Sequence, residues 1–326
     1  MWQVAGHGWA VRLLQRGLED GRVAHAYLFA GPPQVGKTTL ALEFARALLC
    51  TGERPPCDAC PSCHRVQAGT HPDLHLVEGT GKGGAILIDQ VRELRQGAAL
   101  APVYGPYRVY VVPHMERATV EAANALLKTL EEPPPQVVLL LTTSHLASLL
   151  PTIVSRCQVL ALRPLSREEV ERALQERWHL AEADAALLAR LSGGRLGWAV
   201  RASQEPQVLA RRRAWLEALN QALRGGRLLR LRQAETLAAL PEEEVQEVLD
   251  LWAGYFRDLL VWKGGCPDEV HHVDQSAALE EVAGRWTLQQ AREALRAVLA
   301  TWDALQRNAN RRLALEVLLL SLPGVA

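Results

Sequence analysis

Short apolar runs alternate with longer amphipathic segments over residues 1–163. The runs have the length of buried strands, whereas the longer segments repeat their apolar positions with the period of a helix. The expected strands are 26–30, 74–77, 85–88, 108–112, 137–141 and 157–161, and the expected helices are 8–18, 38–50, 89–97 and 117–131. This alternation predicts an α/β fold in which helices cover a mostly parallel sheet.

The pattern becomes entirely helical after the segment Arg163-Pro164-Leu165-Ser166. Ser166 and Glu169 have the spacing of a capping box, which predicts that a helix begins here. Later helices are separated at Gly193-Gly194, Gly225-Gly226, Pro241 and Gly264-Gly265. We therefore expect an α/β domain at 1–163, a small helical lid domain at 164–206 and a separate helical domain at 207–326.

A complete phosphate-binding motif follows the first expected strand. It reads Gly31-Pro-Pro-Gln-Val-Gly36-Lys37-Thr38 and leads directly into an expected helix. In this strand–loop–helix context, backbone N–H groups bind phosphates, the lysine reaches the outer phosphates and the hydroxyl holds Mg²⁺. The candidate residues for binding ATP or ADP with Mg²⁺ are Gly31, Gly36, Lys37, Thr38 and Thr39.

The acidic residues that would complete a hydrolytic site are missing from the expected positions. Such a site needs an Asp at the tip of a second strand and a group that orients water. The strand at 108–112 is followed by Pro113-His114, and Glu116 comes too late, in the expected next turn. The strand at 137–141 ends in Thr142-Thr143, and one of them, with Thr143 the candidate chosen, would sense the γ-phosphate unless both only cap the strand end. Asp89 reads as a helix N-cap. The sequence thus favours nucleotide binding over hydrolysis.

Four of the six cysteines form a cluster with the spacing Cys50-x6-Cys57-x2-Cys60-x2-Cys63. In a reducing compartment this pattern indicates a metal site, and four thiolates give Zn²⁺ a closed, structural shell. We expect a zinc knuckle at 50–63, with an iron–sulfur cluster as the main alternative. His64 and His75 are expected not to be ligands because the four thiolates already fill the shell.

Bulk properties set limits on function. The 326 residues carry zero formal net charge, which gives no global electrostatic case for nucleic-acid binding by this chain alone. No apolar stretch approaches the ~20 residues of a membrane span, and the N-terminal segment lacks the pattern of a secretion signal. The expected location is the cytoplasm, without contact with a membrane.

The order of motifs resembles the bacterial DNA polymerase III clamp-loader subunits, within the AAA+ class. The resemblance rests on the phosphate loop, the four-cysteine insertion and the segment from Ala122 to Pro133 (Ala-Ala-Asn-Ala-Leu-Leu-Lys-Thr-Leu-Glu-Glu-Pro), followed by Ser155-Arg156-Cys157. It covers the whole chain and implies an AAA+ domain, a lid and an all-helical collar domain at 207–326 that mediates oligomerisation.

Two subunit types share these motifs, the gamma/tau motor and the delta-prime subunit. A motor carries an Asp-Glu pair where this chain has Pro113-His114, and a sensor arginine where this chain has Gly197. These departures favour the delta-prime type, whereas the intact Lys37 and Thr38 leave nucleotide binding open. An autonomous ATP-hydrolysing motor remains the alternative, and a zinc-knuckle nucleic-acid module is weaker because residues 50–65 contain no aromatic residue.

The resemblance also implies a role for Arg156. The Ser-Arg-Cys arginine would act in trans as a finger in the ATP site of a neighbouring motor subunit. The implied partners are the gamma/tau and delta subunits in a hetero-pentamer that loads the sliding clamp onto primed DNA.

Overall fold

The computed structural model describes residues 2–307 and 309–324, and their contacts divide the chain into two compact units. The first unit holds the residues up to Leu180 together with Gly194–Trp198. The second holds Ala181–Gly193 and the residues from Ala199 onward. The predicted fold class, a parallel α/β domain followed by helices, is confirmed. The three-domain division at 163 and 206 stays a prediction.

The first unit is built on a five-stranded parallel sheet with the order β2-β3-β4-β1-β5. The strands are β1 (Ala26–Ala30), β2 (Leu74–Leu76), β3 (Arg108–Val112), β4 (Val137–Thr143) and β5 (Gln158–Ala161). Every residue of β1, β3 and β4 is buried, as expected for strands covered on both faces. Because Ala30 pairs with Thr143, the segments that follow β1 and β4 begin side by side.

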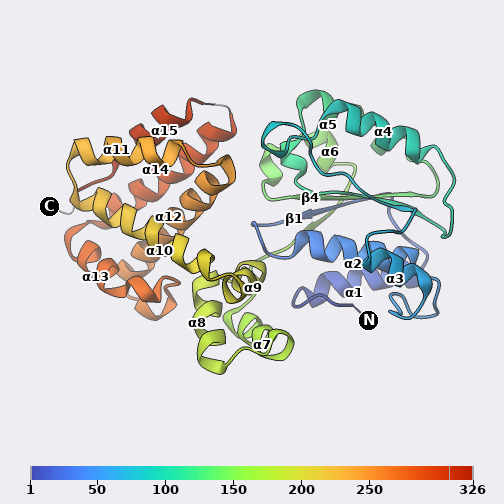
Figure 1. Ribbon diagram of the computed structural model, residues 1–326, viewed down its shortest axis with the longest axis horizontal. Helices are drawn as coiled ribbons and strands as arrows, with labels where there is room; N and C mark the ends of the chain where they lie inside the picture. Colours follow the sequence, from blue (N-terminus) through green and yellow to red (C-terminus); the bar gives the residue numbers. More distant parts are fainter. Residues whose placement is uncertain (1, 308, 325–326) are drawn as a thin grey trace. The chain divides into compact units, whose positions relative to one another are not determined.

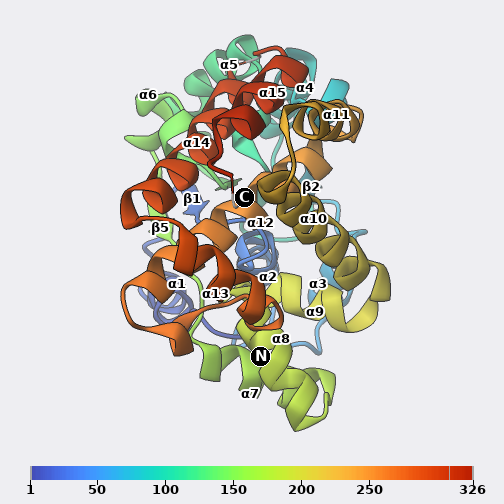
Figure 2. The same ribbon diagram turned by 90° about the vertical axis from the view of Figure 1, so that its left-hand side faces the viewer.

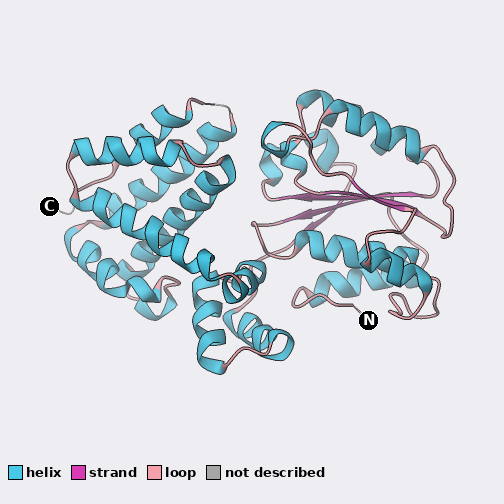
Figure 3. Ribbon diagram, viewed as in Figure 1, coloured by secondary structure: helices cyan, strands magenta, loops and turns pink. Residues whose placement is uncertain are grey.

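Helices cover both faces of the sheet (Figure 1 and Figure 3). On one face lie α1 (Gly8–Glu19), α2 (Lys37–Leu49) and α3 (Pro61–Gln67), and on the other α4 (Ile88–Ala98), α5 (Val120–Glu131) and α6 (Pro151–Val154). Each face has its own core, in which Phe44 of α2 packs with Phe29 on one side, and Leu126 of α5 packs with Leu28 on the other. The helix α7 (Arg167–Trp178) begins at the predicted capping box of Ser166.

Two sequence predictions near residue 88 are wrong. Residues 85–88 do not form a strand, since Ile86 makes only an isolated bridge to Ala118. The helix α4 begins earlier than expected because the Gln90 side chain accepts a hydrogen bond from the Leu87 N–H at 3.1 Å. Asp89 therefore lies inside the first turn and is not the N-cap.

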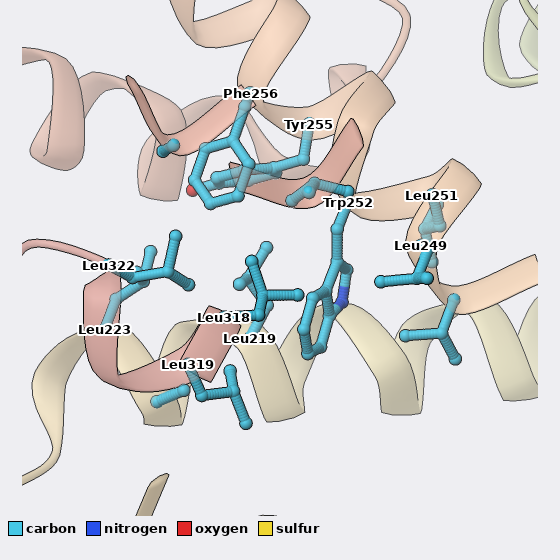
Figure 4. Close-up of a cluster of buried hydrophobic side chains, with 14 of the residues drawn as sticks. Leu219, Leu223, Leu249, Leu251, Trp252, Tyr255, Phe256, Leu318, Leu319 and Leu322 are labelled. Atoms are coloured by element: carbon cyan, nitrogen blue, oxygen red, sulfur yellow. The ribbon is translucent and has the colours of Figure 1, made fainter. Parts of the chain in front are cut away.

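The second unit is entirely helical in its described residues (Figure 2). It contains α8 (Glu182–Ser192), most of α9 (Leu196–Gln204), α10 (Pro206–Arg224), α11 (Arg227–Ala238), α12 (Glu242–Lys263), α13 (Ser276–Arg285), α14 (Leu288–Gln306) and α15 (Arg311–Ser321). Its core gathers around Trp252, Tyr255 and Phe256 of α12 (Figure 4). Leucines from α10 and α15 complete this core, and the Trp252 indole N–H donates to the Trp215 carbonyl at 3.1 Å. No described helix is long and apolar enough to cross a membrane.

Asp258, a fully buried carboxylate on α12, fixes the segment that precedes α13. Its Oδ2 accepts from the backbone N–H groups of His271 and His272 at 2.8 and 2.7 Å, and its Oδ1 from Arg257 at 2.7 Å. Although burial opposes ionisation, the contacts with His272 and Arg257 lower the pKa of Asp258.

Replacing this carboxylate is expected to destabilise the helical unit. Asp258→Asn should lower the free energy of unfolding by about 3 kcal/mol, because a buried charge partner is lost. Since the folded-state pKa is depressed, the stabilisation should be present at neutral pH and should disappear as pH falls below about 4. Urea unfolding at pH 7 and pH 3 would measure both effects, with the exposed Glu280→Gln as the control. Equal stability of the Asp258→Asn and wild-type chains at pH 7 would contradict this expectation.

Candidate nucleotide site, metal centre and arginine finger

The phosphate loop connects β1 to α2 and needs glycine at its first position. A Cβ atom on Gly31 would lie 2.3 Å from the Leu162 carbonyl oxygen, so any side chain would displace the backbone. Gly36 has a φ of 103° and forms the N-cap of α2, whose first residue is Lys37. The loop therefore presents the N-terminus of α2 as an anion-binding end. Thr38 is half-buried in the first turn of α2, and Thr39 is exposed.

Lys37 is buried and all three of its ammonium N–H donors are used. Its Nζ donates to the carbonyls of Gly31 and Pro32 at 2.7 and 2.8 Å, and to the Ser144 hydroxyl at 3.0 Å. Burial lowers the pKa of Lys37 to about 8, and the negative charge of Glu116 acts in the opposite direction. The ammonium is thus held against the loop by groups that follow β1 and β4.

The turn after β3 places one acid, Glu116, near Lys37. Pro113 and His114 occupy the strand end, as the sequence indicates, but His114 takes a left-handed φ of 53° and the 3₁₀ turn Met115–Arg117 follows at once. This tight turn returns Glu116 to the sheet, where its Oε1 accepts from the Ser144 N–H at 3.2 Å. Glu116 lies in the turn after the strand end, as expected, and this turn brings its carboxylate near Lys37.

The surroundings of Glu116 keep its carboxylate ionised at neutral pH. Its side chain is only 8% exposed, and the His114 Nδ1 lies 3.6 Å from its Oε1. Burial by itself would raise its pKa, but hydrogen bonds from His114, from the backbone and from Thr143 outweigh this effect and lower the pKa to about 2. Glu116 therefore carries a negative charge near Lys37 at neutral pH.

The polar end of β4 lies beside the phosphate loop. Thr142 accepts from the His114 N–H at 3.2 Å, and Thr143 accepts from the His145 N–H at 3.1 Å. Both threonines are fully buried, and the side chain that contacts Lys37 belongs to Ser144. Sequence reasoning missed Ser144, although it is the next polar residue after the predicted Thr143.

The start of α9 contacts the phosphate loop directly. The Gly197 N–H donates to the Gln34 carbonyl at 2.9 Å, and Gln34 itself has a φ of 61°. A Cβ atom on Gly197 would lie 2.8 Å from the same carbonyl oxygen, so this approach requires glycine. On the other side, the buried His7 ring contacts the Val35 carbonyl at 2.9 Å. The position that the resemblance aligns with a motor's sensor arginine is thus a backbone contact here.

The four cysteines converge as expected for a metal site. Their sulfur atoms lie within 4.8 Å of one another, and the Sγ atoms of Cys50 and Cys60 are 3.9 Å apart. Tetrahedral Zn²⁺ with bonds of 2.3 Å would place its sulfurs about 3.8 Å apart. Burial opposes ionisation of Cys60, but hydrogen bonds from Cys63 and Thr51 lower its pKa to about 5. Cys57 and Cys63 complete this ligand set.

A buried arginine joins this cysteine cluster to the phosphate-loop helix. Arg46 of α2 is 1% exposed and pairs with Glu43 at 2.6 Å and with Asp58, between the cysteines, at 2.8 Å. Cys50 caps the C-terminus of the same helix. The knuckle is therefore anchored on α2, at the end opposite to the phosphate loop.

The two histidines that the sequence excludes as metal ligands lie outside the cysteine cluster. His75 accepts a hydrogen bond from the Arg108 Nε at 3.1 Å, and no described histidine belongs to the metal-binding group. Residues 50–65 lack an aromatic residue, but the fold brings Tyr104 beneath the Arg65 guanidinium, 4.6 Å from the ring centroid.

Arg156 follows the short helix α6 and is one-third exposed. Its Nη2 lies 2.8 Å from the Glu131 Oε1, and its Nη1 donates to the Thr152 carbonyl at 2.9 Å. Glu131 belongs to the distinctive segment that ends at Pro133, so the two motifs on which the resemblance rests are in contact. Burial raises the pKa of Cys157 to about 12, which suits an apolar packing role.

Comparison with known proteins identifies the family. Residues 6–166 match the family model described as DNA polymerase III, delta subunit, and residues 206–323 match that of its C-terminal region. The chain is 32% identical over 316 residues to the DNA polymerase III subunit delta' of Bacillus subtilis, covering 96% of this chain and 94% of that protein. The chain belongs to the DNA polymerase III delta-prime family.

Other relatives include a second delta' subunit and a tau subunit. The chain is 42% identical over 180 residues to the delta' subunit of Pseudomonas aeruginosa, which covers 52% of this chain and 53% of that protein. It is 36% identical over 200 residues to the tau subunit of Escherichia coli, which covers 59% of this chain but 31% of tau. A solved structure of a DNA polymerase III gamma subunit-related protein from Thermotoga maritima aligns over 95% of this chain and 97% of its own, with 20% identity and a TM-score of 0.47.

These findings confirm the family that the motifs indicate. The AAA+ class expected for the delta-prime family agrees with the parallel sheet and the phosphate loop described above. Membership in the family follows from the comparisons, whereas the roles of Arg156, Lys37 and the four cysteines are proposals.

Proposed function

We propose that this chain is a non-hydrolysing subunit of the DNA polymerase III clamp loader, which places the sliding clamp on primed DNA. It supplies Arg156 in trans to the ATP site of a neighbouring motor subunit. The observation that carries this proposal is the placement of Arg156, which is partly exposed and is held by one carboxylate, Glu131. A guanidinium in this setting can leave a weak surface pair and enter a partner's phosphate site.

The proposed partners are gamma/tau motor subunits and the delta subunit in a hetero-pentamer, in which residues 207–326 act as the collar. One face of α15 supports this role. It exposes Leu313, Val317 and Leu320, with 58%, 67% and 43% of their surface accessible. These residues lie on one side of the helix, and such a stripe is typical of a surface that packs on another helix. This function would place the chain in the cytoplasm.

The four-cysteine cluster is proposed to hold one structural Zn²⁺. The fit between the observed sulfur separation and tetrahedral geometry supports this assignment. All four ligand positions are supplied by the chain, so bound zinc would keep no open position for a substrate. The ion would fix the loop between α2 and α3 and would take no part in ATP chemistry.

The chain alone is expected to hydrolyse ATP at a negligible rate. The strand end at Pro113-His114 offers no carboxylate to orient water, and Glu116 is hydrogen-bonded to the Ser144 backbone. Phosphate release from the purified chain should stay at the background of a Lys37→Ala variant. Addition of motor subunits should produce turnover that depends on the motors' own phosphate loops.

The competing function is that of an autonomous ATPase motor, and one observation favours it. Glu116 lies close enough to Lys37 to affect its pKa, so an acid is present at the site. Turnover by the isolated chain that disappears in Lys37→Ala would establish this alternative. It would then follow that Glu116 performs the task of the missing strand-end acids.

A further inference from the structure

The two oxygens of the Glu116 carboxylate differ in their contacts. Its Oε1 accepts the Ser144 N–H, whereas its Oε2 is buried and has no hydrogen-bond partner among residues 2–307 and 309–324. The side chain is more than nine-tenths buried. A buried, ionised oxygen without a partner is costly, so the arrangement indicates a place for a further donor or cation.

Neighbouring charges do not fill this place. The ammonium of Lys37 directs its three N–H donors at Gly31, Pro32 and Ser144, and therefore donates none to Glu116. The His114 ring is half-exposed and lies 3.6 Å from the other carboxylate oxygen. The side chains of His114 and Thr143 lie close enough to lower the pKa of Glu116, but neither gives its Oε2 a donor with hydrogen-bond geometry. A bound ligand could supply the donor that this oxygen lacks.

The position of Glu116 identifies the kind of partner. It lies in the turn after β3, next to Ser144 after β4 and near Lys37, whose loop follows β1. These three strands are neighbours in the sheet, and ligands of parallel α/β sheets bind at the carboxyl ends of the strands. Mg²⁺ in nucleotide sites keeps several of its waters, which donate to nearby carboxylates.

We propose that the phosphate loop of this chain binds a Mg²⁺–nucleoside triphosphate and that Glu116 is the acid that receives the ion's coordinated water. Thr38 would be the direct protein ligand, and Glu116 would hold the outer shell through its free oxygen. This assignment deepens the nucleotide binding that the proposed function leaves open. It agrees with negligible hydrolysis, because the strand end at Pro113-His114 supplies no second acid to orient the attacking water.

The proposal makes the effect of Glu116 depend on Mg²⁺. Without the ion, a buried carboxylate repels the triphosphate, so Glu116→Gln should bind ATP more tightly than the wild type. With the ion, the carboxylate stabilises the complex, so Glu116→Gln should bind more weakly. We expect each change in affinity to be on the order of 30-fold, which corresponds to the about 2 kcal/mol of a hydrogen bond to a charged group.

The experiment is titration of the full chain with a fluorescent ATP analogue, in Mg²⁺ and in EDTA. The matched control is Glu121→Gln, an exposed acid in the first turn of α5, which should behave as the wild type in both conditions. Circular dichroism would verify folding. Glu116→Asp keeps the charge on a shorter side chain and should retain the repulsion in EDTA while losing most of the gain from Mg²⁺.

Three outcomes would overturn the proposal. One is absence of ATP binding by the wild-type chain in Mg²⁺. Another is tighter binding by Glu116→Gln to the same degree with and without Mg²⁺, which would make Glu116 only a counter-charge for Lys37. The third is unchanged binding in both conditions. None of these outcomes bears on Arg156, whose role is measured at a partner's site, so failure of this proposal and failure of the proposed function are distinguishable.

Discussion

Arg156→Ala is expected to abolish ATP turnover at the one motor site that faces this subunit, while the chain itself stays folded. A positioned arginine is worth on the order of 10³-fold or more at the site it serves. The substitution removes only a partly exposed pair with Glu131, so the free energy of unfolding should change by less than about 1 kcal/mol. Zinc content and any nucleotide binding by this chain should be unchanged.

The measurement is ATP hydrolysis and clamp loading by the reconstituted complex. Because other motor sites remain intact, the bulk hydrolysis rate should fall by a fraction, whereas clamp loading should fall further if the sites act in concert. Arg156→Lys should rescue poorly, since a point charge does not reproduce the planar fork. Arg92→Ala, which removes another exposed pair on the same unit, is the matched control. If complexes with Arg156→Ala load clamps at the wild-type rate, the proposed role of Arg156 is wrong and this chain acts only as a scaffold.

Loss of the proposed zinc site is expected to have the largest effect on stability. Structural Zn²⁺ binds small domains with on the order of 10 kcal/mol of free energy at neutral pH, part of which stabilises the folded state. Loss of the knuckle would also separate the buried Arg46 from Asp58. If about 3 kcal/mol is lost, the Tm of the first unit should fall by roughly 10 °C.

Elemental analysis should find one zinc per chain, and Cys60→Ser or a chelator should produce the fall in Tm. Cys266→Ser, at an exposed cysteine outside the cluster, should not. In Cys60→Ser, the ATP turnover that this chain stimulates in the motor should fall less than the Tm of the first unit does. The reason is that the knuckle lies at the end of α2 far from the phosphate loop. Iron with visible absorbance, or absence of any metal, would contradict the zinc assignment.

Secondary structure was predicted best for the segments that are completely buried. The strands β1, β3 and β4 are buried throughout, so their apolar runs could be read directly. The strand prediction at 85–88 was wrong because the Gln90 side chain accepts a hydrogen bond from the Leu87 N–H, and α4 begins at Ile88. The apolar character of the run gives no sign of this contact. The phosphate loop and the cysteine cluster were predictable because their chemistry depends on local spacing.

The rest of the site depends on contacts that spacing cannot show. The proximity of Glu116 to Lys37 could not be predicted, because the left-handed conformation of His114, which returns Glu116 to the sheet, has no clear signature in a single sequence. The pairing of Arg156 with Glu131 joins residues from separate elements. Ser144 could have been found, since it directly follows β4, the strand that neighbours the phosphate-loop strand.

The contact between Gly197 and Gln34 restricts the evolutionary routes open to this chain. A motor needs a long, charged side chain at this position, but even a single Cβ atom would lie 2.8 Å from the Gln34 carbonyl. An arginine introduced at position 197 would first have to push the start of α9 away from the loop. An arginine at position 197 would therefore require at least one compensating change in the backbone of 32–35, so a single substitution there is not expected to create a motor-like lid.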